Sequence, residues 1–129
     1  MTSEPIDSIY GVAMSEWISL VPGELPRDAV GLWQIVPAGT IHFKLSGNDL
    51  VDYVRRNIYA LLGAGAVPVI SGGETGFDWV YQPQFGATKE EIAQSVIAEW
   101  QRIGNDVGDL AGSIWFALPR PGKKYVKMD

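Results

Sequence analysis

The pattern that decides the fold lies in residues 46–63, SGNDLVDYVRRNIYALLG. Its apolar residues recur at spacings of three and four, which is the period of a helix that buries one face. Ser46 is a candidate N-cap and Gly63 a candidate C-cap, so both ends of this helix are marked in the sequence. The predicted apolar face consists of Leu50, Val51, Val54, Ile58, Leu61 and Leu62.

A second helical pattern occupies residues 88–104, TKEEIAQSVIAEWQRIG. Thr88 and Glu91 have the spacing of a capping box, and Gly104 ends the pattern. We expect this helix and the one at residues 46–63 to lie side by side on one face of a sheet. Its apolar stripe consists of Ile92, Ala93, Val96, Ile97, Trp100 and Ile103.

The predicted strands surround these two helices. Residues 66–71 form an apolar run, residues 77–81 are rich in aromatics, and the glycines between them predict a hairpin. Residues 113–118 form a further strand, and residues 40–45 alternate polar and apolar side chains as a half-buried strand does. The order strand, helix, strand, strand, helix, strand predicts an α+β fold with a ferredoxin-like βαββαβ core. A different sheet order, or an N-terminal strand that joins the sheet, are the alternatives.

The first 39 residues form an N-terminal extension of the single domain that we expect over residues 1–119. Within it, Leu25–Val36 is predicted to be a helix with Pro26 in its first turn, although residues 32–36 also fit a strand. The extension is too apolar to stay in water. We expect it to cover the other face of the sheet, to extend an edge, or to meet a second subunit.

Composition limits the class of protein. The chain has 129 residues, of which 47% are hydrophobic, and no run of about 18 apolar residues that would cross a membrane. It has no cysteine, which excludes disulfides and thiolate chemistry and favours a cytoplasmic location. The net charge of −5 disfavours a nucleic-acid partner. Four of the ten basic residues lie in residues 120–129, which we expect to be an extended basic tail.

Residues that could carry chemistry are sparse. His42 is the only histidine, so no multi-histidine metal site exists, and no spaced nucleophile accompanies it. The glycine-rich residues 71–76 lack the Gly-Lys-Ser/Thr of a phosphate loop. We therefore predict no catalytic residue, no metal and no cofactor, and consider the protein more typical of a binding protein than of an enzyme.

Residues 76–81, GFDWVY, partly resemble the RNA-binding motif of RNA-recognition domains, in which a basic residue and a glycine precede alternating aromatics. Thr75 stands where the basic residue belongs, and Asp78 where a small residue belongs. The acidic composition adds to this departure, so we expect no RNA partner.

Five tryptophans and a strand that is apolar on both faces predict a sheet that is covered on both sides. The leading hypothesis is a cytoplasmic protein-interaction or binding module that pairs with a protein or with itself as a homodimer. The alternatives are a small-molecule-binding protein or small enzyme with a Trp/Tyr-lined cleft, and an acidic immunity or antitoxin-type partner of a basic protein. The candidate ligand-binding residues are His42, Asp78, Trp79 and Tyr81, and the candidate interaction residues are Tyr10, Trp17, Trp33 and Trp115.

Overall fold

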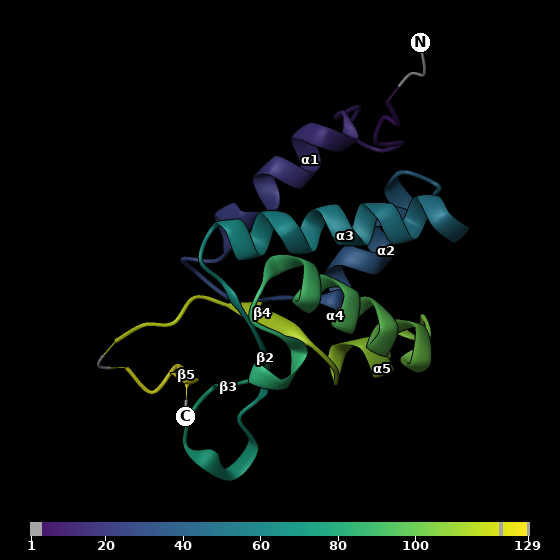
Figure 1. Ribbon diagram of the computed structural model, residues 1–129. Coiled ribbons are helices and arrows are strands. Elements are labelled where there is room, and N and C mark those ends of the chain that lie inside the picture. The colour runs from purple at the N-terminus through teal and green to yellow at the C-terminus, as the bar shows by residue number, and fades with distance from the viewer. Residues whose placement is uncertain (1–3, 122, 129) are drawn as a thin grey trace.

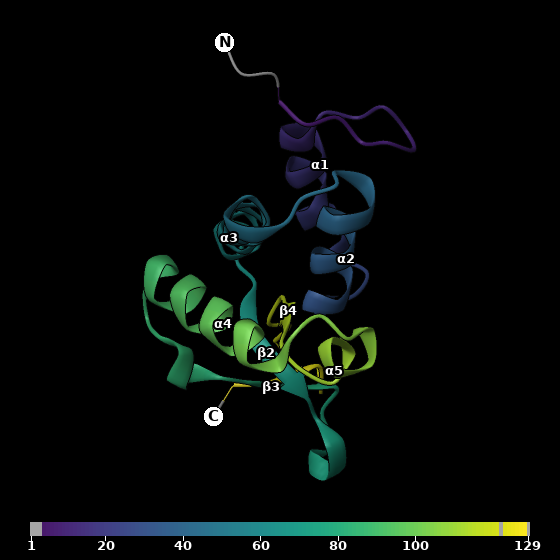
Figure 2. The ribbon, with the colours of Figure 1, turned by 90° about the vertical axis from the view of Figure 1, so that its right-hand side faces the viewer.

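The structure, a computed structural model, describes residues 4–121 and 123–128. The fold is α+β, with a five-stranded mixed sheet whose α-helices gather on one side, as Figures 1 and 2 show. In chain order the elements are α1 (Met14–Leu20), η1 (Val21–Glu24), β1 (Val30–Gly31), α2 (Leu32–His42), α3 (Gly47–Gly63), β2 (Val67–Ser71), η2 (Gly73–Thr75), β3 (Trp79–Tyr81), η3 (Pro83–Phe85), α4 (Lys89–Ile103), α5 (Val107–Ala111), β4 (Trp115–Ala117) and β5 (Val126–Lys127).

The sheet has the order β1-β4-β2-β3-β5. Strand β4 is antiparallel to both β1 and β2, β2 and β3 form the expected antiparallel hairpin, and β5 runs parallel to β3. The connection from β1 to β2 therefore joins two parallel strands with the antiparallel β4 between them. The connection from β3 to β4 likewise joins two parallel strands with the antiparallel β2 between them. The α+β class is confirmed, but the predicted ferredoxin-like strand order is wrong.

The two predicted amphipathic helices form and pack against each other on the helical side of the sheet (Figure 2). Helix α4 begins with the predicted capping box, in which Thr88 Oγ1 accepts from the Glu91 amide at 3.1 Å. Helix α3 packs mainly against α4, α2 and the N-terminal helical segments. Both helices bury their stripes in one core that also includes Phe116 from the interior strand β4.

The strand predicted at Thr40–Leu45 does not form, because α2 extends to His42 and the chain then turns. Ile35, Val36 and Gly39 are buried at helical spacing, and this period prevails over the short alternation that follows it. Lys44 adopts a positive φ of 57°, which no strand accommodates.

The helix predicted at Leu25–Val36 begins only at Leu32, and Val30–Gly31 forms the edge strand β1 instead. One alternative is therefore confirmed, since an N-terminal strand joins the sheet. The expectation that the extension covers the second face of the sheet is wrong, because α1 and η1 pack against α3 on the helical side.

The C-terminal segment, which we expected to be an extended basic tail, contributes the short strand β5. Val126 is buried, and β5 pairs with β3 at the edge of the sheet. Arg120 donates to the carbonyl oxygens of Leu25 and Pro26, and its guanidinium lies 4.1 Å from the centre of the Tyr125 ring. These contacts tie the end of the chain to its N-terminal third.

Candidate functional site

A cleft of about 290 Å³ lies between α2, α3 and the N-terminal segment α1–η1. Trp17, Leu20 and Val21 form one wall of the cleft, and Ile35 and Ala38 of α2 form another. Most of this lining is apolar. Ligand sites in proteins are typically apolar hollows with a few fixed polar groups, and their volumes begin at about 300 Å³.

The polar groups of the cleft come from Tyr53 and Asn57 of α3, which also line it. Both residues are fully buried, at 0% exposure. Neither the Tyr53 hydroxyl nor Asn57 Oδ1 has a hydrogen-bond partner among the described residues. Buried polar groups are nearly always paired, and an unpaired one costs about 1–3 kcal/mol. Two such atoms beside one cleft are the strongest sign of a ligand in this structure.

The orientation of the Asn57 amide follows from its place on the helix. Its Nδ2 donates to the carbonyl oxygen of Tyr53, one turn earlier, at 2.9 Å. A reversed amide would set two acceptors against each other, so Oδ1 is the atom left without a partner.

The Tyr53 hydroxyl is held in its neutral form. Burial raises the pKa of Tyr53 to about 12, and the neighbouring side chains of Asn57 and Trp17 oppose this effect only in part. Neither neighbour reaches the oxygen with hydrogen-bonding geometry. The phenol therefore keeps its proton at physiological pH and can both donate and accept.

The mouth of the cleft carries Leu20, Glu24 and Gln34, whose side chains are exposed. Glu24 Oε1 accepts from Arg27 at 3.0 Å, and Gln34 Oε1 accepts from the Gly31 amide at 2.9 Å. The rim thus presents a carboxylate near the entrance. The buried floor of the cleft, formed by Tyr53 and Asn57, carries no charge.

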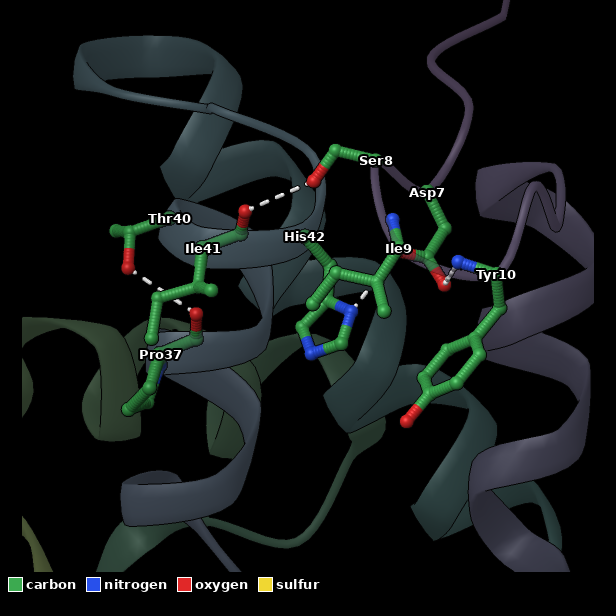
Figure 3. A network of polar contacts seen from close by, with 8 residues as sticks. All are labelled: Asp7, Ser8, Ile9, Tyr10, Pro37, Thr40, Ile41 and His42. Atoms are coloured by element: carbon green, nitrogen blue, oxygen red, sulfur yellow. Dashed lines mark hydrogen bonds and ion pairs between the residues drawn. The ribbon is translucent and has the colours of Figure 1, made fainter.

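His42 lies at the C-terminal end of α2, and its Nδ1 is 2.8 Å from Asp7 Oδ1 (Figure 3). Because a carboxylate only accepts, Nδ1 carries the proton. Asp7 is buried and also accepts from the amides of Ile9 and Tyr10. Burial raises the pKa of the Asp7 carboxyl, but these amides and the His42 ring together outweigh burial, so the pKa lies below its ordinary value.

The Asp7–His42 pair fixes the N-terminal loop on α2. Ser8 adds a backbone hydrogen bond from its amide to the His42 carbonyl oxygen at 2.8 Å, and its hydroxyl donates to Ile41 (Figure 3). The His42 ring also lies 4.7 Å from the ring of Trp17, which lines the cleft. Among the described residues the imidazole has one side-chain hydrogen-bond partner, Asp7, and this contact holds the N-terminal loop beside the cleft wall.

The candidate residues regroup in the structure. His42 lies with Tyr10 and Trp17, which were predicted as interaction residues. Trp79 and Tyr81 belong instead to β3, and Asp78 directly precedes it. The structure thus does not group His42 with Asp78, Trp79 and Tyr81, and a ligand-binding role of each of these residues stays a prediction.

A row of three tryptophans is the second grouping. Trp115 lies between Trp33 and Trp79, with ring centres 6.1 Å and 5.0 Å away. Trp79 and Trp115 belong to the small apolar cluster on the helix-free face of the sheet, where they are only partly buried. That face is therefore aromatic and incompletely covered.

A larger hollow of about 690 Å³ lies between α4, α5 and the end of β2, and its lining is more polar. Several of its polar side chains already pair with each other or with the backbone. Arg102 pairs with Glu99, Gln82 donates to the Val80 carbonyl oxygen at 3.1 Å, and Gln84 donates to Gln82 at 2.6 Å. This hollow leaves no buried polar atom for a ligand to satisfy.

Metal and membrane signals are also lacking in the described part of the chain. Within residues 4–121 and 123–128, no three histidine, aspartate or glutamate side chains lie together as metal ligands would. The helices described there are too short or too polar to span a bilayer.

The chain matches no protein-family model, no curated protein and no solved structure.

Tyr53 and Asn57 were not among the candidate residues, although a signal for them exists. They fall into the helical stripe with Leu50, Val54 and Ile58, at positions where the spacing of three and four calls for apolar side chains. An asparagine at a core position of a helix is the feature that would have identified the site.

Proposed function

We propose that the protein binds a small, largely apolar molecule in the cleft between α1–η1, α2 and α3. The observation that carries this proposal is the pair of buried, unpartnered polar atoms on Tyr53 and Asn57 beside an apolar lining. An apolar cavity of about 150 Å³ is large enough for benzene, so a cleft of 290 Å³ accommodates a ring with a short substituent.

Methyl-resolved NMR with small neutral aromatics tests this function. Toluene and benzyl alcohol should shift the methyl signals of Leu20, Val21 and Ile35, which line the cleft, and leave those of Val69 and Val126 in place. Absence of any shift at millimolar concentrations of either compound would contradict the proposal.

A pair of matched substitutions strengthens that experiment. Ala38→Phe places a ring inside the cleft and should abolish the shifts, because Ala38 forms part of its wall. Ala98→Phe adds the same ring at an exposed position of α4 and should leave binding unchanged.

Self-association is a second candidate function, favoured by the partly exposed tryptophans on the helix-free face of the sheet. A homodimer that buries this face should show a concentration-dependent mass in light scattering, and Trp33→Ser should weaken it, because Trp33 is the exposed end of the row. A constant monomer mass up to about 1 mM would rule this candidate out.

A further inference from the structure

The geometry points to a specific polar group on the ligand: we propose that the cleft selects a neutral group that both donates and accepts a hydrogen bond, such as an alcohol or a primary or secondary amide. This inference rests on the proposed function, and it adds a chemical class to the ligand. It depends on the two atoms of α3 that lack partners.

Asn57 Oδ1 requires a hydrogen-bond donor on the ligand. Its amide orientation is fixed by the bond from Nδ2 to the Tyr53 carbonyl oxygen, so the free atom can only accept. A ketone, an ether or a tertiary amide has no N–H or O–H to offer, and would leave Oδ1 buried and unpaired.

The Tyr53 hydroxyl supplies the complementary half of the contact. It retains its proton, because burial raises the pKa of Tyr53 to about 12, and it can donate to a ligand oxygen. Tyr53 and Asn57 are four residues apart on one helix, so their side chains lie on the same face as neighbours. Both atoms are fully buried, and the side chain of Trp17 lies beside the Tyr53 hydroxyl. A shift of this cleft-lining side chain would let one ligand hydroxyl or amide engage both groups at once.

Charged groups fit this floor poorly. A carboxylate would set its oxygens against Asn57 Oδ1 and would pass the Glu24 carboxylate at the rim. An ammonium could donate to Oδ1, but it would lose its hydration beside fully buried side chains without a buried counter-ion. The site therefore discriminates on donor, acceptor and charge together.

Four probes that share a phenyl ring separate these requirements. Benzyl alcohol donates and accepts, benzyl methyl ether only accepts, toluene does neither, and benzoate is an anion. From cleft methyl shifts at neutral pH we expect benzyl alcohol to bind at least about tenfold more tightly than each of the other three. Similar affinities for benzyl alcohol, the ether and toluene would overturn this inference and leave the proposed function intact. No binding of any probe would instead contradict the proposed function itself.

Variants assign the preference to the two residues. Asn57→Leu and Tyr53→Phe should each reduce the affinity ratio of benzyl alcohol to toluene toward one, because each removes a hydrogen-bonding atom from the floor. Tyr59→Phe removes a hydroxyl from the same helix outside the cleft and should leave the ratio unchanged. The ratio compares two ligands on one protein, so a change in stability does not alter it. If Asn57→Leu and Tyr53→Phe both keep the wild-type affinity ratio of benzyl alcohol to toluene, the assignment of the preference to these two residues would be overturned.

Discussion

At the scale of single residues, Asn57 stands out because its side chain is polar where the helix faces the core. Its amide stabilises little, since the Tyr53 carbonyl that it contacts already lies within the hydrogen-bonded helix. Its free oxygen has a desolvation cost without a compensating bond. A residue that lowers stability at a cleft is typical of a binding site.

We therefore expect Asn57→Leu to raise the free energy of unfolding by about 1 kcal/mol, because it removes an unpaired buried acceptor next to a cleft with room for the larger side chain. Urea denaturation measures the change, with Tyr59→Phe as the control on the same helix. A loss of stability of about 1 kcal/mol or more would show that the amide is structural.

Asp7 provides a prediction about pH. Its folded-state pKa is lowered, so its contribution to stability is present above the unfolded pKa and is lost as the pH falls through the folded value. Asp7→Asn should therefore lower the urea midpoint at neutral pH, and the difference from the wild type should shrink at about pH 3. Asp52→Asn, at an exposed position of α3, is the control. If the difference in urea midpoint between Asp7→Asn and the wild type does not change with pH, the lowered pKa of Asp7 is contradicted.

At the scale of elements, the contact between α2 and α3 builds the floor of the cleft. Gly39 allows the helices to approach closely, since a Cβ there would lie 2.7 Å from Leu50 Cδ1 and 2.9 Å from Tyr53 Cδ2. The close approach sets the position of the Tyr53 ring. A glycine inside a helix is tolerated here because the neighbouring helix leaves no room for a side chain.

Gly39→Ala should therefore destabilise the protein by about 1–2 kcal/mol, as overpacking outweighs the better helix propensity of alanine. Gly63→Ala, at the end of α3 where a Cβ meets nothing closer than 3.4 Å, should be neutral or slightly stabilising. Thermal unfolding of the two variants measures the difference. Equal stability of both would show that α2 and α3 can separate at no cost.

The sequence predicted the elements whose pattern is long and bounded by caps. Helices α3 and α4 and the β2–β3 hairpin were predicted because 15 or more residues of helical period, or glycines between two apolar runs, leave few alternatives. The short alternation at Thr40–Leu45 was misleading, because six residues fit a strand and a helix end equally well. Strand β5 has only two residues and depends on pairing with β3, which no local pattern shows.

At the scale of the whole molecule, strand order depends on contacts between distant segments, and the sequence alone could not supply it. The strand β1 was weighed only as an alternative, and its two residues pair with Trp115 and Phe116, more than 80 positions along the chain. The side chains that form the cleft also come from separate segments, so their meeting follows from the tertiary fold and not from any motif.

Arg120 connects the two ends of this fold. Its guanidinium donates to the carbonyl oxygens of Leu25 and Pro26 and covers the Tyr125 ring. We expect Arg120→Ala to lower the free energy of unfolding by about 1–2 kcal/mol through the loss of these contacts. Lys123→Ala, which is exposed in the same segment, is the control in chemical denaturation. An equal and small effect of both would show that the C-terminal segment adds nothing to stability.

The position of β4 between β1 and β2 has a consequence for biosynthesis. A growing chain holds β1, β2 and β3 before residues 115–117 are translated, yet β1 and β2 meet only through β4. Helices α1 to α3 can associate early through contacts close in sequence, whereas the sheet must wait for the last tenth or so of the chain. Until then β2 keeps an open edge, so premature termination upstream of β4 should yield an aggregation-prone nascent product.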